Sequence, residues 1–320
     1  MKMNNIKNKF FKLTMKLIGN KGLAKNRLGN SVKDFLTRNC KTNEMSVNGY
    51  KMLLHDNMEI SLRPYEPIET EIVKTHVEKN NIVVDIGANI GYYTLLMALN
   101  QAKVFSYEPE PKNFKLLQKN VNLNNFSSNV KLYNKAVSNY NGFSKLFLAG
   151  ATDLNGGVIV DRAKGGAPGM HTLSNNRFDS NSIDVNLINR RLGTTPFLEF
   201  INKVEQKIRK PIVIAAAMQD MSNVANIVVE VTKLNLDKID FAKIDVEGHE
   251  LHVLEGMKIL PTKILIEFNP LYLQASGKNY NDFFHFIEKF TIKQISKDGL
   301  EELDYEELIK SKMSRNLFLY

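Results

Sequence analysis

An apolar run that breaks at glycines and continues directly as a helical pattern constrains the fold of this chain most strongly. The segment 83–94 reads Val-Val-Asp-Ile-Gly-Ala-Asn-Ile-Gly-Tyr-Tyr-Thr. A short continuous apolar run is typical of a strand buried on both faces of a parallel sheet. A glycine-rich turn from such a strand into a helix places a small-molecule site at the carboxyl edge of the sheet. The segment therefore predicts an α/β fold with a ligand site at this turn.

A carboxylate in the second apolar run indicates what kind of ligand binds. This run, 104–107, ends in Glu108 and Pro109, twenty-one residues after Gly87. A carboxylate at the tip of the second strand is well placed to accept hydrogen bonds from ribose hydroxyls. The two features together predict a cofactor that contains a nucleoside. The alternative is that the glycines form only a tight turn, and the spacing to Glu108 favours the cofactor.

The charge of the glycine-rich turn narrows the choice of cofactor. A dinucleotide site favours three glycines, whose backbone approaches the pyrophosphate closely. This turn has two, Gly87 and Gly91, and it opens with the carboxylate of Asp85. An anion there repels phosphate but can hold an ammonium group, directly or through water. S-adenosylmethionine offers a ribose for Glu108 and an ammonium group for Asp85, without any phosphate.

Strand and helix patterns alternate along most of the chain, which predicts a doubly wound, mostly parallel sheet with right-handed crossovers. We expect strands at 82–87, 103–108, 130–137, 227–231, 241–245 and 263–268. Helices are expected at 66–79, 91–99, 111–122 and 281–290, with another from about 250 to 258. We also expect a short hairpin at 51–62 and a closing antiparallel pair at 292–295 and 317–320.

The basic character of the chain belongs to its first residues. The net charge is +9, but residues 1–41 alone carry eleven Lys or Arg against one acid, and the rest is close to neutral. Apolar residues recur there at helical spacing (Ile6, Phe10, Leu13, Leu17), so residues 1–45 are predicted to form a basic amphipathic arm. Two interpretations stay open: peripheral contact with an anionic membrane surface through residues 1–41, or packing against protein.

A long segment interrupts the alternation of strands and helices. Residues 150–226 contain glycine-rich loop signals, a possible helix near 196–209 and an apolar stretch at 211–218. We interpret them as an insertion within one domain, 46–320, between the third and fourth sheet strands. A lid or substrate platform and a segment without function are both open.

Composition limits the compartment and the class of partner. No run approaches the roughly 18 to 20 apolar residues of a membrane span, and the first residues lack a clean secretory signal. The single cysteine, Cys40, favours a reducing compartment. We therefore expect a cytoplasmic location, with the inner membrane surface as the alternative. The neutral body disfavours nucleic acid as the substrate.

A second group of ionisable residues follows the predicted strand 241–245. Asp245, Glu247, His249 and Glu250 crowd the turn at its carboxyl end, where they should approach whatever Gly87 binds. A carboxylate or imidazole there can act as general base. The alternative is that they cap the next helix. The group also resembles a carboxylate–imidazole metal site, but no second cluster accompanies it, and we expect no metal.

Five blocks occur in an order that resembles the FkbM-type methyltransferases. They are Y-E-P-I-E-T at 65–70, V-V-D-I-G-A-N-I-G-Y-Y-T-L-L at 83–96, Y-E-P-E-P-K-N-F at 107–114, N-K-A-V-S at 134–138 and K-I-D-V-E-G-H-E at 243–250. The resemblance implies the class I, Rossmann-like methyltransferase fold with a seven-stranded sheet. It also implies S-adenosylmethionine as cofactor and transfer to oxygen, commonly a hydroxyl of a sugar or secondary metabolite.

The resemblance also implies roles for individual residues. The cofactor loop would be formed by Asp85, Gly87, Asn89 and Gly91. Glu108 and Pro109 would lie at the ribose, and Lys135 and Ala136 beside the adenine. Asp245 would lie at the methyl-transfer edge as a cofactor-binding and catalytic residue, with Glu247 and His249 as further catalytic candidates. Glu66 would help to close the pocket.

These observations favour an O-methyltransferase with a small-molecule or glycan acceptor, and three other functions remain open. One is a methyltransferase that acts on nitrogen, or on a protein or nucleic acid. Another is a membrane- or partner-docking module that keeps the fold without turnover. A nicotinamide-dependent dehydrogenase is the third, and Asp85 and Asn89 in the loop argue against it. The sequence predicts neither the acceptor nor the oligomeric state.

Overall fold

A computed structural model describes residues 44–54, 64–147, 226–276, 278–311 and 314–320. The chain divides into two compact units, and its described residues belong to the first up to Tyr65 and to the second from Glu66 on. In the first unit, β1 (Glu44–Val47) and β2 (Tyr50–Leu53) form an antiparallel hairpin. The Asn-Gly turn of this hairpin lies at 48–49. Of the hairpin expected at 51–62, residues 55–62 lie outside the described residues, so that expectation stays a prediction.

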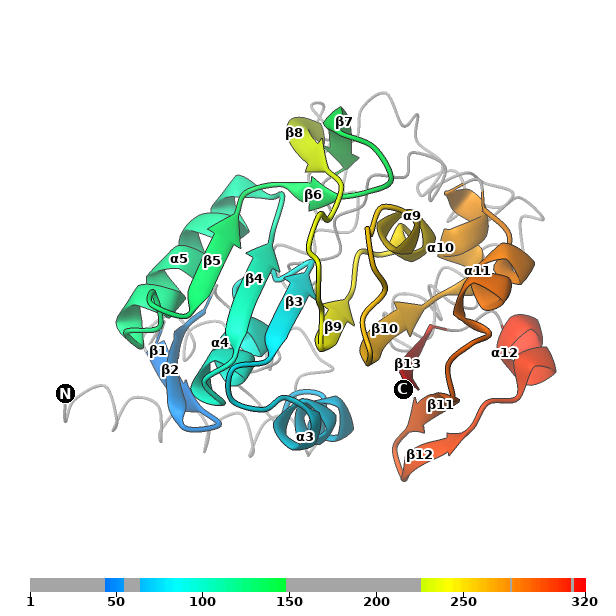
Figure 1. The fold of residues 1–320 in the computed structure, drawn as a ribbon, viewed down its shortest axis with the longest axis horizontal. Helices are drawn as coiled ribbons and strands as arrows, with labels where there is room; N and C mark the ends of the chain where they lie inside the picture. Colours follow the sequence, from blue (N-terminus) through cyan, green and yellow to red (C-terminus); the bar gives the residue numbers. More distant parts are fainter. Residues whose placement is uncertain (1–43, 55–63, 148–225, 277, 312–313) are drawn as a thin grey trace, which may run out of the picture. The chain divides into compact units, whose positions relative to one another are not determined.

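The second unit is built on an eight-stranded sheet with the order β12-β11-β13-β10-β9-β3-β4-β5 (Figure 1). Its strands are β3 (Ile82–Ile86), β4 (Lys103–Tyr107), β5 (Val130–Tyr133), β9 (Phe241–Ile244), β10 (Ile264–Phe268), β11 (Ile292–Ser296), β12 (Gly299–Glu302) and β13 (Arg315–Leu319). The resemblance implied seven strands, and this number is therefore wrong. The extra strand is β12, which pairs with β11 as an antiparallel hairpin at the edge of the sheet.

The strand order reverses between β3 and β9. Strands β3, β4 and β5 follow one another in one direction, whereas β9 and β10 continue from β3 in the other, all in parallel. In an open α/β sheet, the crevice outside the carboxyl ends at such a reversal is where ligands bind. The last strands close the sheet, with β13 antiparallel to both β10 and β11, which confirms the predicted closing pair.

Helices cover both faces of this sheet, which confirms the doubly wound α/β architecture. They are α3 (Pro67–His76), α4 (Tyr92–Leu99), α5 (Pro111–Leu123), α9 (Glu250–Glu255), α10 (Pro270–Ala275), α11 (Tyr280–Ile287) and α12 (Tyr305–Ser311). On one face, Val253 and Leu254 of α9 pack with Ile244 of β9 in the large apolar core. On the other face, Thr94 of α4 bonds to Asp85 of β3.

Local signals explain where the helices begin. α5 follows Glu110, whose side chain accepts a hydrogen bond from Asn113 N (2.6 Å), and it has proline in its first turn. α11 is capped in the same way by Asn279, which accepts from Asp282 N (2.9 Å). α9 is shorter than the expected helix to 258, since it ends at Gly256.

A separate three-stranded sheet, in the order β6-β8-β7, corrects two expectations. Its strands are β6 (Ala136–Val137), β7 (Gly142–Phe147) and β8 (Asn226–Thr232). The strand expected at 130–137 is two strands in different sheets, and between them the Asn134 amide donates to Glu108 O (2.8 Å) and turns the chain. The strand expected at 227–231 exists as β8, but it does not belong to the main sheet.

The long segment predicted as an insertion leaves and returns through one strand pair. Phe147 at the end of β7 lies opposite Asn226 at the start of β8. Residues 148–225, with the helix expected at 196–209, lie outside the described residues, as do residues 1–43 with most of the basic arm. None of the helices that the structure describes is both long and apolar enough to cross a bilayer.

Replacing Gly256 by alanine tests how tightly the end of α9 packs against Ser138, the residue that follows β6. A Cβ atom at Gly256 would lie 1.9 Å from Ser138 O, while its φ of −83° suits any residue. We expect Gly256→Ala to lower the free energy of unfolding by about 1–3 kcal/mol, because the backbones must move apart. Urea unfolding measures this, and an unchanged midpoint and slope would contradict the packing.

Candidate active site

The site begins where the loop after β3 touches the end of β9. Gly87 has a φ of +81°, and a Cβ atom there would lie 1.9 Å from Asp245 O, so only glycine fits. The amide of Asp245 in turn donates to Ile86 O (3.0 Å). These contacts lie at the reversal of strand order, and they bring together the two groups of residues that the sequence placed 150 or more residues apart.

Three N–H groups of the loop donate to the end of β4 and to Glu108. Gly87 N and Ala88 N both donate to Tyr107 O (3.0 Å each) at the end of β4. Asn89 N donates to Glu108 Oε2 (2.8 Å). In a dinucleotide site these groups would point at the pyrophosphate. Here they are engaged by a carbonyl and a carboxylate, so they cannot cradle a phosphate.

Glu108 is buried, and its carboxylate has acceptor capacity left over. Oε2 accepts from Asn89 N and Oε1 from Glu110 N (2.8 Å each). A carboxylate has roughly four lone-pair sites, so about two remain for hydroxyl groups. Burial raises the pKa of Glu108 to about 8, against the two backbone hydrogen bonds, which lower it. Additional hydroxyl donors would favour the ionised form.

A pocket opens beside Glu108 at the carboxyl edge of the sheet. It is lined by Ile86, Gly87, Tyr107, Glu108, Pro109, Lys135, Ala136, Val137, Leu146, Asp245, Val246 and His249. Of the predicted site residues, the structure thus brings Gly87, Glu108, Pro109, Ala136, Asp245 and His249 together around one pocket.

Five lining residues were not predicted as site residues: Ile86, Tyr107, Val137, Leu146 and Val246. Tyr107 stacks on Tyr133, with ring centroids 4.6 Å apart and the planes within 9° of parallel. Its aromatic position directly before Glu108 was a signal that could have been used. Leu146 comes from β7 of the small sheet, and its sequence neighbourhood gave no comparable signal.

Four predicted cofactor residues lie outside the pocket lining: Glu66, Asp85, Asn89 and Gly91. Asp85 is 2% exposed, and it accepts a hydrogen bond from the Thr94 hydroxyl (2.5 Å). Burial raises the pKa of Asp85 to about 6. Asn89 contributes its backbone N–H to Glu108. Gly91 lets α5 approach, since a Cβ atom there would lie 2.5 Å from Leu117.

Glu66 belongs to a buried polar group on the α3 and α4 face of the sheet. It precedes α3 with a φ of 41°, and it accepts a hydrogen bond from the Tyr93 hydroxyl (2.5 Å). Burial raises the pKa of Glu66, and the nearby Lys243 lowers it. Lys243, a residue that sequence reasoning missed, forms an ion pair with Asp245 (3.1 Å).

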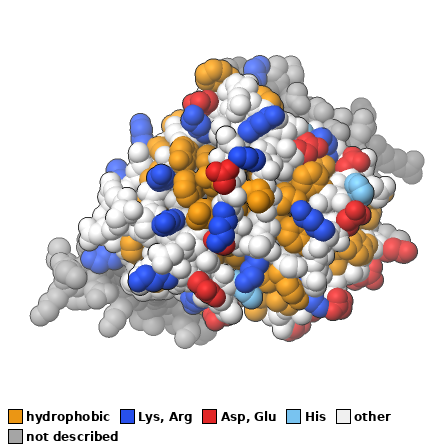
Figure 2. Space-filling model, in the orientation of Figure 1, with side chains coloured by type: hydrophobic (Ala, Val, Ile, Leu, Met, Phe, Trp, Pro, Cys, Tyr) orange, Lys and Arg blue, Asp and Glu red, His pale blue; other side chains and the backbone are white. Residues whose placement is uncertain are grey.

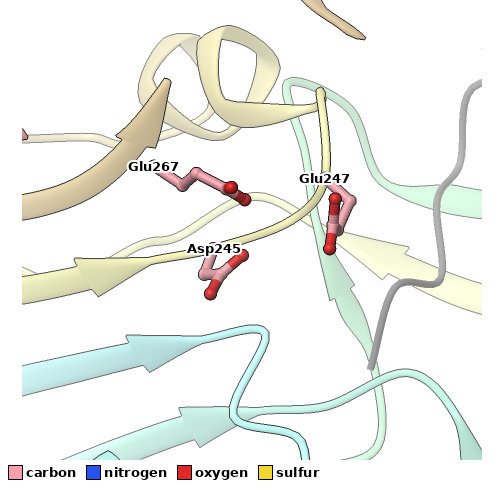
Figure 3. A group of neighbouring side chains, drawn as sticks. All are labelled: Asp245, Glu247 and Glu267. Atoms are coloured by element: carbon pink, nitrogen blue, oxygen red, sulfur yellow. The ribbon is translucent and has the colours of Figure 1, made fainter. Parts of the chain in front are cut away.

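Three carboxylates meet at the far end of the site. Asp245 and Glu247 come from the turn after β9, and Glu267 extends toward them from β10 (Figure 3). One oxygen of each lies within 4.8 Å of the others. Burial raises the pKa of Glu267 well above its usual value, and Glu247 and Asp245 raise it further. Such a group attracts a cationic ligand, and its spacing also suits a divalent cation. The absence of a metal stays a prediction.

Glu247 is held in an unusual conformation. Its φ of 55° is left-handed, and the following Gly248 has a φ of 101°. The buried Glu250 carboxylate holds this turn by accepting from Gly248 N (3.0 Å) and Val246 N (3.3 Å). Non-glycine residues with such backbone angles cluster at functional sites. Glu250 thus supports the turn that carries Glu247, and Glu247 itself lies outside the pocket lining.

His249 is held against the wall of the pocket. Its Nε2 lies 2.8 Å from the buried Ser138 hydroxyl, and its ring stacks on His252 with centroids 4.1 Å apart. Burial lowers the pKa of His249 to about 3, with further lowering from His252 and Lys278. So weak a base accepts a proton poorly at neutral pH. Burial and the contact with Ser138 therefore disfavour His249 as the proton acceptor, which leaves Asp245 and Glu247 as the candidates.

Gly87→Ala tests the close approach on which the pocket depends. The new Cβ atom would force the loop away from Asp245 O, so we expect nucleoside binding to be lost in calorimetric titrations. Gly299→Ala is the matched control, since Gly299 also has a positive φ (+130°) but has open space around it. If both variants bound nucleoside equally well, the close approach would not shape the pocket.

Comparison with known proteins identifies a family that matches most of the second unit. The family described as "Methyltransferase FkbM domain" matches residues 85–306. The curated protein "Methyltransferase sdnD" of Sordaria araneosa is 27% identical over 186 residues, which are 57% of this chain. The match spans 62% of the length of that relative.

Solved structures give weaker similarities. A putative transferase, PH0793 of Pyrococcus horikoshii, is 13% identical, with a TM-score of 0.38 over 87% of this chain and 71% of that one. An S-adenosylmethionine-dependent methyltransferase of Agrobacterium tumefaciens is 10% identical, with a TM-score of 0.36 over 86% of this chain and 68% of that one.

Proposed function

Because the chain belongs to the FkbM methyltransferase family, we propose that it transfers a methyl group from S-adenosylmethionine to a hydroxyl group of a sugar, glycan or secondary metabolite. The observation that carries this proposal is the engagement of the loop N–H groups by Tyr107 and Glu108. A nucleoside without phosphate suits such a loop, and the remaining acceptor capacity of Glu108 suits the two ribose hydroxyls.

The charge of the site supports a cationic cofactor. Carboxylates of Asp245, Glu247 and Glu267 gather at one end, Asp85 is buried, and Glu66 is partly buried. Buried carboxylates without enough compensating charge attract a cation. S-adenosylmethionine has both a sulfonium and an ammonium group, whereas a dinucleotide would bring two phosphates toward these carboxylates.

The residues of this chain then have distinct roles in the transfer. S-adenosylmethionine, when bound, supplies a methyl group activated by its positively charged sulfur. Glu108 orients the ribose, and the neutral His249 and stacked Tyr107 form walls of the pocket. The cofactor would supply its methyl group to the acceptor oxygen, and its sulfur would keep the electron pair of the carbon–sulfur bond. Asp245 or Glu247 takes the hydroxyl proton.

Holding the acceptor in line with the breaking bond accounts for much of such a catalytic effect. Two carboxylates on one turn suit this task, because a hydroxyl group can donate to one of them while the other orients it. An amine acceptor is the second candidate, since an acidic edge also attracts ammonium groups. We do not propose nucleic acid as the substrate, because these carboxylates would repel its phosphate groups.

The charge distribution on one face of the molecule supports a small acceptor. On the face shown in Figure 2, Lys and Arg side chains are interspersed with acidic and apolar ones. A nucleic-acid enzyme more often gathers basic residues around its cleft. The single cysteine supports a cytoplasmic location, and contact with a membrane surface through residues 1–41 stays a proposal.

Glu108→Gln tests the cofactor assignment. The amide NH₂ of the variant would face a backbone N–H, and the charged carboxylate that accepts hydrogen bonds from the ribose would be lost. We therefore expect S-adenosylmethionine to bind about 10- to 100-fold more weakly. Isothermal titration calorimetry measures this, with Glu71→Gln as control, since the Glu71 side chain is 70% exposed on α3. Equal affinity in both variants, or comparable binding of a nicotinamide dinucleotide to the unaltered protein, would contradict the assignment.

Asp245→Asn tests the methyl-transfer edge. We expect methyl transfer to fall by about 10²- to 10⁴-fold, because the proton acceptor is lost. Cofactor affinity should also fall, but by a smaller factor, because one of the carboxylates that attract the cation loses its charge. The assay uses sugar and glycan extracts with labelled S-adenosylmethionine, and mass spectrometry identifies the product. Asp237→Asn, at an exposed ion pair with Lys258, is the control. Label on nitrogen, or only in protein or nucleic acid, would overturn the choice of acceptor.

A further inference from the structure

Lys243 is a charged residue inside a strand that is otherwise apolar. β9 reads Phe-Ala-Lys-Ile, and all four residues are buried. Ala242 and Ile244 belong to the large apolar core on the α9 side of the sheet. Because side chains alternate along a strand, Lys243 points to the opposite face, together with its register partner Asp85 on β3. Lys243 is 2% exposed.

The Lys243 ammonium lies in the middle of the buried polar group beneath the site. Its Nζ is 3.1 Å from Asp245 Oδ2 and 5.3 Å from the centre of the Tyr93 ring. The Tyr93 hydroxyl donates to Glu66 (2.5 Å). The Lys243 ammonium group therefore links Asp245 at the pocket to Glu66 before α3, through its contact with the Tyr93 ring.

The charged groups that face Lys243 are predominantly acidic. They are Glu66 before α3, Asp85 of β3, Asp245 after β9 and Glu267 of β10, with Glu69 of α3 acting on Glu66. Tyr93 of α4 adds a ring and a hydroxyl. Burial raises the pKa of both Glu66 and Asp85, and Lys243 opposes it at each.

Packing alone does not account for a lysine at this position. Taking an ammonium group out of water is costly, and replacing buried ion pairs by apolar residues is often neutral or stabilising. The neighbours of Lys243 along β9 show that the strand accepts apolar residues. The electrostatic effect on the surrounding carboxylates is what an apolar residue could not supply.

We propose that Lys243 is a positioning residue, whose ammonium group keeps the carboxylates of Glu66, Asp85 and Asp245 ionised and in place for a cationic cofactor. This inference rests on the proposed function. Lys243 does not touch the reacting atoms. It acts through Asp245, which lines the pocket, and through the negative charge that the buried group presents to the sulfonium and ammonium groups.

The test is the pH dependence of S-adenosylmethionine binding to Lys243→Met. Removing an opposite charge at this distance raises a carboxyl pKa by about 1–3 units. Glu108, with a pKa of about 8, titrates in the unaltered protein and in the variant alike, so the ratio of their affinities at each pH isolates the effect of Lys243. In the unaltered protein we expect the fall in affinity that Asp85 causes to occur as the pH drops through about 6, where Asp85 protonates. In Lys243→Met the fall should begin at least about one pH unit higher, leaving binding about tenfold weaker at pH 7 and recovering toward pH 9.

Two variants make this result specific. Lys243→Arg keeps the charge and should keep the pH profile of the unaltered protein. Lys238→Met removes a lysine that is 67% exposed and pairs with Asp240 just before the same strand, so it should change nothing. A Lys243→Met profile equal to that of the unaltered protein, or weaker by the same factor at every pH, would overturn the proposal.

A second measurement separates this proposal from the proposed function. Carboxyl groups labelled with ¹³C report their own protonation by NMR, and Asp85→Asn and Glu66→Gln assign their signals. We expect both to titrate at higher pH in Lys243→Met, or in Lys243→Gln if the methionine variant does not fold. Unshifted titrations would overturn the role of Lys243. Shifted titrations in a protein that binds no S-adenosylmethionine would instead overturn the proposed function.

Discussion

The site depends on a loop whose N–H groups donate to the end of the neighbouring strand. Gly87 lies against Asp245 O so closely that no side chain fits between them, and the loop amides donate to Tyr107 O and the Glu108 carboxylate. These contacts join the ends of β3, β4 and β9 at the reversal of strand order. They also decide what can bind, because amides that are already engaged cannot hold a phosphate.

The charges of the site also determine which ligand it favours. Burial raises the pKa of Asp85, Glu108 and Glu267, so that the free site holds carboxyl groups that are costly to ionise. Hydroxyl donors at Glu108 and positive charge near Glu267 both favour the ionised forms. A ligand that brings a ribose and a cation together therefore relieves both costs. In this account, Lys243 supplies part of that compensation before the ligand arrives.

Much of this arrangement could be predicted from the sequence, because buried parallel strands and their terminal turns leave strong patterns. The loop at Gly87, the carboxylate of Glu108 and the turn at Asp245 were all found in that way, and they line one pocket. The small sheet was missed, because an apolar run does not reveal which sheet it joins and a side-chain contact of Asn134 turns the chain. Lys243 was missed although a lysine within a predicted buried strand is itself a signal of function.

A crystal structure of the protein with S-adenosylhomocysteine tests the central claim most directly. The account predicts both ribose hydroxyls within hydrogen-bonding distance of the Glu108 carboxylate, while Asn89 N keeps its bond to the same group. It also predicts the sulfur near Asp245, with the adenine beside Ala136. A nucleoside bound elsewhere, or a loop whose amides leave Tyr107 O to contact the ligand, would contradict it.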